Sequence, residues 1–129
     1  QQAAGEPRIV FTGFVEGRTL QELYSNSYIY VLPSDLEGMP MSLLEAMSYG
    51  NCCLTSDIPE CTEVVEDKAA TFEHGSVDSL RDSLQGLLEE PQAVQRYKAD
   101  ATGFITSKYD WDAVTERTLA TYATDEKNL

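Results

Sequence analysis

Short apolar runs alternate with segments of helical periodicity along this chain, and this alternation constrains the fold more than any other feature. Each run ends at a glycine, a proline or a polar residue, as strands do. The predicted strands cover residues 8–11, 28–32, 52–55 and 70–72. Because strands that alternate with helices form right-handed βαβ units, the sequence predicts an α/β fold with a parallel sheet and helices on both faces.

The helix-like segments repeat apolar residues every three or four positions. Predicted helices cover residues 17–27, 40–49, 60–66 and 91–107, and two further helices open at Ser76 and Asp110. Pro40 suits the first turn of its helix, and Gly50 is placed to cap the end of that helix. The sequence therefore indicates where most of these helices begin or end.

The composition is that of one ordinary soluble domain, with 129 residues of which 42% are hydrophobic. The formal net charge is −13, with nine Lys and Arg residues and no basic patch. Nucleic acid is therefore excluded as an expected partner, because phosphate backbones bind basic surfaces. No apolar stretch approaches the roughly 20 residues of a membrane helix. We expect a cytoplasmic chain, while a peripheral membrane association of the parent protein stays open.

The three cysteines, Cys52, Cys53 and Cys61, match neither zinc-ligand spacing nor a disulfide framework. We expect free, buried or half-buried thiols in a reducing cytoplasm, and no metal site. The chain begins at Gln1 rather than Met and enters a predicted strand almost at once. We therefore interpret residues 1–129 as a single partial domain of a longer protein.

Glu45 is the only charged residue between Gly38 and Ser56, and apolar residues surround it in the sequence. A carboxylate in such company is costly to bury without hydrogen-bond donors, so it is a candidate site residue. If the helix begins near Pro40, the backbone amides of Met41, Ser42 and Leu43 are unsatisfied and favour an anion. The hydroxyl of Ser42 adds a donor.

Glu37 lies just before Gly38, whose missing side chain lets a ligand approach the backbone. Two carboxylates on either side of an anion-binding turn suit a molecule that has both hydroxyls and phosphates, such as a nucleotide sugar. Two structural alternatives stand beside this reading. Glu37 could be an exposed loop residue, and Glu45 could be a structural carboxylate bonded to a neighbouring strand.

Ligands of parallel sheets bind outside the carboxyl ends of the strands. The residues predicted at those ends are 13–14, 33–38 and 56–57. His74 is predicted to be a loop residue without a catalytic partner. Asp57 and Glu60 lie near the same edge, and the sequence leaves their role open.

Six motifs resemble glycosyltransferase family 4 in order and spacing, and the likeness continues to residue 122. They are residues 11–15 (FTGFV), 20–24 (LQELY), 31–34 (VLPS), 37–50 (EGMPMSLLEAMSYG), 56–57 (SD) and 63–66 (EVVE). The resemblance implies the GT-B architecture, in which two Rossmann-like domains enclose the active site in a cleft. It also implies a retaining sugar transfer from a nucleotide donor, UDP- or GDP-linked, without a required metal or other cofactor.

The resemblance also implies roles for individual residues. Glu45 would hold the ribose hydroxyls, and Glu37, the candidate catalytic residue, would lie beside the transferred sugar. Gly13 and Phe14 would border the nucleobase. The backbone around the helix start would contact the sugar and the diphosphate, through Gly38, Met39, Pro40, Met41, Ser42 and Leu43. The expected acceptor is a glycan or lipid of the cell envelope.

The likeness covers only the latter part of the nucleotide-sugar-binding domain, so the N-terminal acceptor domain is expected to be a missing partner. No Lys or Arg lies between Arg18 and Lys68 to neutralise a diphosphate. We therefore expect no sugar transfer by this chain alone. The alternative function is a catalytically inactive nucleotide-binding or interaction module. A sheet without its neighbouring strands also leaves an edge, and we expect self-association through residues 8–11.

Overall fold

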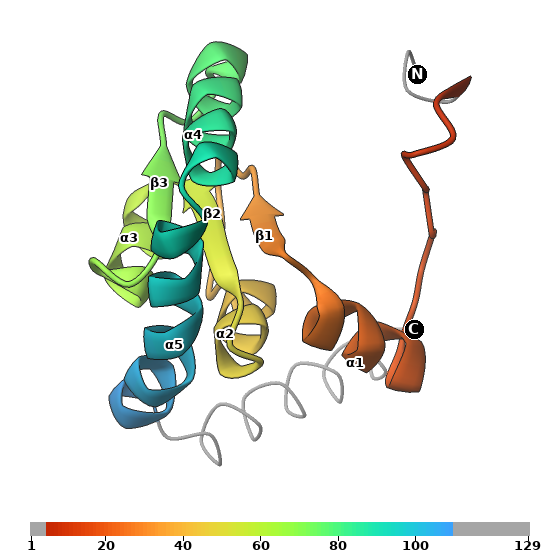
Figure 1. Cartoon of the computed structure of the whole chain (residues 1–129). Helices are drawn as coiled ribbons and strands as arrows, with labels where there is room; N and C mark the ends of the chain where they lie inside the picture. Colours follow the sequence, from red (N-terminus) through yellow and green to blue (C-terminus); the bar gives the residue numbers. More distant parts are fainter. Residues whose placement is uncertain (1–4, 110–129) are drawn as a thin grey trace, which may run out of the picture.

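The computed structural model describes residues 5–109 of the chain (Figure 1). The elements are α1 (Gly17–Asn26), β1 (Ile29–Leu32), α2 (Met41–Ser48), β2 (Cys52–Ser56), α3 (Pro59–Val65), β3 (Ala70–Phe72), α4 (Val77–Glu89) and α5 (Pro91–Lys108). They confirm the predicted alternation of strands and helices from α1 to α5. The helix predicted from Asp110 onwards lies outside the described residues.

The three strands form one parallel sheet in the order β1-β2-β3. Ile29 pairs with Cys52 at the start of the β1–β2 ladder. Leu54 pairs with Ala70 at the start of the β2–β3 ladder. The predicted parallel sheet is therefore confirmed, and β2 is its central strand.

Helices cover both faces of the sheet, as predicted. All five residues of β2 are buried, which is typical of a central parallel strand with helices on both sides. Its side chains alternate between two core clusters. Cys53 packs with residues of α2, α3 and the C-terminal half of α5. Cys52 and Leu54 pack with residues of α4 and the N-terminal half of α5. The three cysteines are free and buried, as expected.

Local sequence signals set the ends of these helices. At the end of α2, Gly50 has a φ of +76°. Its N–H donates to the carbonyl of Met47 at 3.0 Å. At the start of α4, the side chain of Ser76 accepts a hydrogen bond from the backbone N–H of Ser79 at 3.1 Å. Both residues cap the helices that they were predicted to cap.

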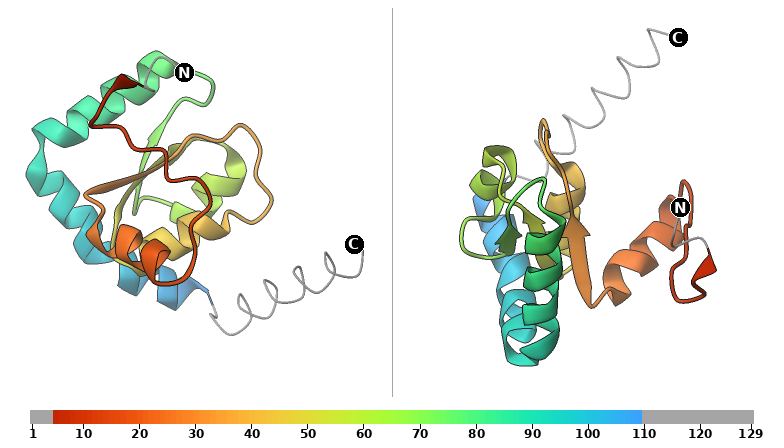
Figure 2. Two further views of the ribbon diagram at one scale, coloured as in Figure 1. Left: turned by 90° about the vertical axis from the view of Figure 1, so that its right-hand side faces the viewer. Right: turned by 90° about the horizontal axis from the view of Figure 1, so that it is seen from above.

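The strand predicted at residues 8–11 is wrong. This segment has no strand assignment, and it lies with the first part of α1 away from the sheet (Figures 1 and 2). No described strand lies beside it, so a ladder cannot form there to satisfy its backbone N–H and C=O groups. The self-association edge expected at this segment therefore does not exist as a strand. In the described sheet the two edge strands are β1 and β3.

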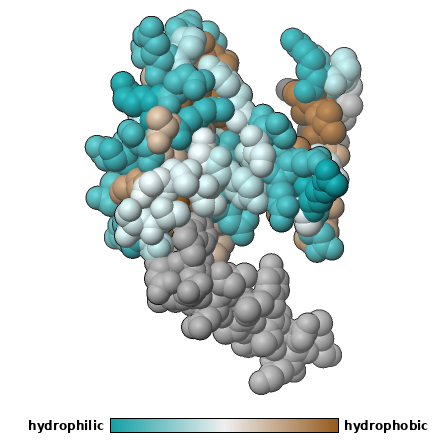
Figure 3. Space-filling model, turned by 60° about the horizontal axis from the view of Figure 1, so that its bottom comes forward, coloured by the Kyte–Doolittle hydropathy of each residue, from teal (hydrophilic) through white to brown (hydrophobic). Residues whose placement is uncertain are grey.

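The same segment carries an unusual amount of exposed apolar surface. Val10, Phe11 and Phe14 are 75%, 72% and 88% exposed. Figure 3 shows a hydrophobic patch on this part of the molecule, separated from the sheet and its covering helices. Among the described helices, none is long and apolar enough to cross a membrane.

Candidate functional site

The loop that follows β1 places Glu37 at the carboxyl edge of the sheet, and α2, which begins beside that edge, carries Glu45. Glu37 lies in the loop, and Glu45 lies one turn into α2. Both side chains are half-buried. This edge is where ligands bind in open parallel sheets, so the fold places both carboxylates in a suitable region.

Glu37 is held in place by hydrogen bonds. The hydroxyl of Ser34 donates to Glu37 Oε1 at 2.6 Å. The backbone N–H of Ser34 donates in turn to Ser56 Oγ at 2.7 Å, which ties the loop to the end of β2. Glu37 is therefore not the freely exposed loop residue of the structural alternative. The sequence analysis missed the role of Ser34, although its position three residues before a carboxylate is typical of such a contact.

Glu45 lies near the side chains of two tyrosines, Tyr24 from α1 and Tyr30 from β1. Burial, the neighbouring Tyr30 and the carboxylate of Glu45 raise the pKa of Tyr24 well above its usual range. The Tyr24 hydroxyl therefore keeps its proton and can serve as a donor. Its ring stacks on that of Tyr49, with 5.3 Å between the ring centroids. The stacked ring of Tyr24 is therefore held in place next to Glu45.

Ser42 receives a hydrogen bond from Tyr30, whose hydroxyl donates to Ser42 Oγ at 2.8 Å. Burial raises the pKa of Tyr30, and the charges of Glu37 and Glu45 act in the same direction. The Tyr30 hydroxyl therefore lies within electrostatic reach of both carboxylates. Sequence reasoning missed this tyrosine, because a tyrosine in an apolar strand is typical of core packing.

The backbone amides at the start of α2 were expected to lack hydrogen-bond partners, and this holds only in part. The N–H of Met41 donates to the carbonyl of Met39 at 2.8 Å, and the N–H of Leu43 donates to that of Pro40 at 3.1 Å. These two amides are thus not unsatisfied, because a tight turn and a short first helical turn give them partners. The expectation of three free amides was wrong for Met41 and Leu43.

Gly13 and Phe14 are not brought to the carboxylates. They precede α1 in the segment that stands apart from the sheet (Figure 1). Phe14 is 88% exposed. In this structure the two residues therefore border no site formed by Glu37 and Glu45, and their role at the nucleobase stays a prediction.

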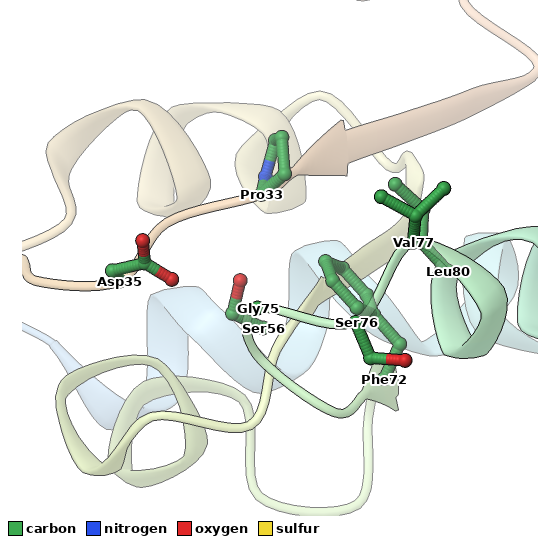
Figure 4. Close-up of a pocket in the computed structure, with 8 residues that line it drawn as sticks. All are labelled: Pro33, Asp35, Ser56, Phe72, Gly75, Ser76, Val77 and Leu80. Atoms are coloured by element: carbon green, nitrogen blue, oxygen red, sulfur yellow. The ribbon is translucent and has the colours of Figure 1, made fainter.

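A pocket of about 220 Å³ opens at the same carboxyl edge, on the side of α4. Its lining residues are Pro33, Asp35, Ser56, Phe72, Gly75, Ser76, Val77 and Leu80 (Figure 4). They come from the ends of all three strands and from the start of α4. The sequence analysis placed the loop ends 33–38 and 56–57 at this edge, and it missed the contribution of α4. Neither Glu37 nor Glu45 lines this pocket.

His74 has a partner that sequence reasoning did not find. Its backbone N–H donates to Asp57 Oδ1 at 3.0 Å, and its Nδ1 lies 2.8 Å from the same oxygen. The hydrogen bonds from His74 lower the pKa of Asp57. The bond to Asp57 in turn raises the pKa of His74. The pair joins the loops after β2 and β3. Within residues 5–109, no group of three acidic, His or Cys side chains is placed to hold a metal ion.

Comparison with known sequences finds one matching family model, described as glycosyl transferases group 1, over residues 1–104. An uncharacterized glycosyltransferase of Methanocaldococcus jannaschii is 27% identical over 117 residues, which is 89% of this chain and 30% of that protein. The O-antigen chain mannosyltransferase B of Escherichia coli is 28% identical over 123 residues, which is 95% of this chain and 32% of that protein.

A solved structure shares the fold. Sucrose-phosphate synthase from Thermosynechococcus elongatus matches with a TM-score of 0.73 and 19% sequence identity. The match covers 95% of this chain and 31% of that structure. The chain thus spans about a third of the length of these similar proteins.

Proposed function

Because this chain belongs to the group 1 glycosyl transferases, we propose that it is the nucleotide-sugar-binding part of a retaining glycosyltransferase. The parent enzyme transfers a sugar from a UDP- or GDP-linked donor to a glycan or lipid acceptor. The remaining strands and the acceptor domain lie outside this chain. Names such as O-antigen chain mannosyltransferase among its relatives favour a cell-envelope polysaccharide as the product.

One observation carries the proposal most directly. Ser42 and the two carboxylates Glu37 and Glu45 were singled out from the sequence. In the structure the Tyr30 hydroxyl donates to Ser42 Oγ, and the charges of both carboxylates reach Tyr30. Glu37 and Ser42 lie by the carboxyl edge of a parallel sheet, where such folds bind nucleotides, and Glu45 lies one turn further along α2. A loop and a helix thus contribute two carboxylate acceptors and one hydroxyl donor to the same region.

The chemistry of these groups suits a sugar nucleotide. A half-buried carboxylate accepts two hydrogen bonds from a ribose diol, which is the role that we assign to Glu45. The hydroxyl and the backbone N–H of Ser42 donate to the diphosphate at the start of α2. Glu37, oriented by Ser34, accepts hydrogen bonds from the transferred sugar and holds its reacting carbon toward the acceptor.

Charge neutralisation of the diphosphate comes from elsewhere in the enzyme under this proposal. The sequence has no Lys or Arg between Arg18 and Lys68. A diphosphate bound only at α2 would meet a chain with a net charge of −13. The isolated chain is therefore expected to bind a donor weakly and to transfer no sugar. Detectable transfer by the isolated chain would contradict this division of roles.

The proposal is tested by calorimetric titration of the complete protein with UDP, GDP and ADP and their glucose and mannose conjugates. The variant Glu45→Gln should lose about ten- to hundredfold in affinity for the nucleotide that binds, because a charged hydrogen-bond acceptor becomes neutral. Glu63→Gln, which removes one charge from an exposed position of α3, is the matched control and should bind normally.

Equal binding by Glu45→Gln and the unchanged protein would contradict the assigned role of Glu45. Binding of a nucleotide sugar without transfer to any envelope acceptor would instead support the alternative, an inactive nucleotide-binding module. A sugar-transfer assay with the complete protein separates the two functions.

A further inference from the structure

Tyr30 is in direct contact with Ser42, one of the groups of the proposed donor site. Its hydroxyl lies 2.8 Å from Ser42 Oγ. Its ring is half-buried and packs against the core cluster beneath α2, with its centroid 6.0 Å from that of Tyr24. Nothing in the chemistry of the core requires a hydroxyl at this position, since a phenylalanine ring would fill the same space.

The direction of the hydrogen bond matters for what Ser42 can do. A serine hydroxyl has one hydrogen to donate and two lone pairs to accept with. The Tyr30 hydroxyl is protonated at neutral pH, as tyrosines ordinarily are, and in the structure it donates to Ser42 Oγ. When it donates to Ser42 Oγ, it occupies a lone pair and leaves the Ser42 hydrogen for another acceptor. An anionic phosphate oxygen at the start of α2 is such an acceptor.

The base of this contact is rigid. Tyr30 lies within β1 and pairs with Cys53 of the fully buried strand β2. A side chain anchored on a strand holds its partner more accurately than one on a loop. Ser42, in the first turn of α2, would otherwise be free to turn its hydroxyl toward backbone carbonyls of the helix.

We propose that Tyr30 is a positioning residue, which fixes Ser42 so that the Ser42 hydroxyl donates to a phosphate of a bound nucleoside diphosphate. This inference rests on the proposed donor site, and it adds a residue that neither the motifs nor the comparisons assign. The ligand class is a nucleoside diphosphate, because the start of α2 and the Ser42 hydroxyl both offer hydrogen-bond donors to a phosphate.

The test is a double-mutant cycle in the complete protein, with UDP and GDP as probes in calorimetric titrations. Ser42→Ala should weaken binding by about ten- to hundredfold, the worth of one hydrogen bond to a charged group. Tyr30→Phe should weaken it by about three- to tenfold, the worth of one neutral hydrogen bond. The double variant should bind no more weakly than Ser42→Ala, because Tyr30 acts through Ser42. Uridine and guanosine, which lack the phosphates, should bind Tyr30→Phe and the unchanged protein equally well.

Tyr28→Phe is the matched control and should bind normally, because Tyr28 is exposed and faces Lys98 instead of the site. Three results would overturn the inference: unchanged UDP and GDP binding by Tyr30→Phe, losses that multiply in the double variant, or an equal loss of nucleoside binding. If Glu45→Gln weakens binding while Tyr30→Phe does not, only this inference fails. If the unchanged protein binds no nucleotide, the proposed function fails with it.

Discussion

At the scale of single residues, Glu45 and Glu37 could be predicted because charge is rare around them. Between Gly38 and Ser56 the sequence has one carboxylate, and a carboxylate in an apolar helix is costly to bury without hydrogen-bond donors. Tyr30 could not be predicted in the same way. A tyrosine in an apolar strand is common in cores. The hydrogen bond of its hydroxyl becomes visible only in the fold, which brings Ser42 beside it.

The Asp57–His74 pair gives a prediction about pH. The hydrogen bond to Asp57 raises the pKa of His74 above its ordinary value of 6.5. His74 therefore stabilises the fold fully below 6.5, and this contribution is lost as pH rises through the higher pKa of the folded state. The pKa of Asp57 is lowered from 3.8, so its contribution is present above 3.8 and is lost as pH falls through the lower folded value.

His74 is the only histidine of the chain, so its imidazole signals in an NMR titration are unambiguous. We expect a pKa above 6.5 in the unchanged protein and a lower pKa in Asp57→Asn, because the variant removes the negative partner. The stabilising contribution of the pair should be largest between about pH 4 and 6.5. A pKa of His74 at or below 6.5 that does not respond to Asp57→Asn would contradict the contact.

Among the secondary-structure elements, the helix ends were predicted mainly from the residues that cap them. Gly50 ends α2 through a left-handed backbone conformation, and Ser76 begins α4 through a side-chain hydrogen bond. The bounds of α2 and the start of α4 therefore agree with the sequence to within a residue or two. The prediction of a strand at residues 8–11 was wrong for a different reason. Apolar residues show that a segment can be a strand, whereas a strand forms only when a neighbour pairs with it.

Gly50, which follows α2, and Gly75, in the loop before α4, form a matched pair for testing the cost of a left-handed backbone. Both have a φ of +76°. A Cβ at Gly50 would lie 3.3 Å from Thr102 Oγ1 on α5, whereas a Cβ at Gly75 would have nothing within 4 Å. Gly75→Ala should lower the free energy of unfolding by about 1–2 kcal/mol, the cost of the left-handed conformation.

Gly50→Ala should cost at least as much as Gly75→Ala, because the contact with Thr102 is added to the backbone strain. Urea denaturation of both variants measures the difference. If Gly50→Ala is as stable as the unchanged protein, the assigned termination of α2 is incorrect.

At the scale of the whole molecule, the parallel sheet with helices on both faces followed from the alternation of elements, and it agrees with the fold of sucrose-phosphate synthase. The position of α1 and of the segment before it could not be derived from periodicity. Periodicity reports which faces are apolar, and it says nothing about which partner covers them.

The exposed apolar segment before α1 gives a prediction about self-association. Val10 and Phe11 are 75% and 72% exposed, and burial of such surface between two copies is favourable. We expect concentration-dependent association of the 129-residue chain in light scattering. Salt should strengthen it, because screening weakens the repulsion between chains of charge −13.

The variant Phe11→Ser should weaken this association, and Thr71→Ser, a change at an exposed position of β3, should leave it unaltered. A strictly monomeric chain at high concentration and high salt would contradict the prediction.

A crystal structure of the complete protein with the nucleoside diphosphate that it binds would decide whether Glu45 and the start of α2 hold the donor. We expect both ribose hydroxyls to lie within hydrogen-bond distance of the Glu45 carboxylate, and the phosphates to lie at the start of α2 beside Ser42. A nucleotide bound elsewhere, with Glu45 in contact only with Tyr24 and Tyr30, would contradict this expectation.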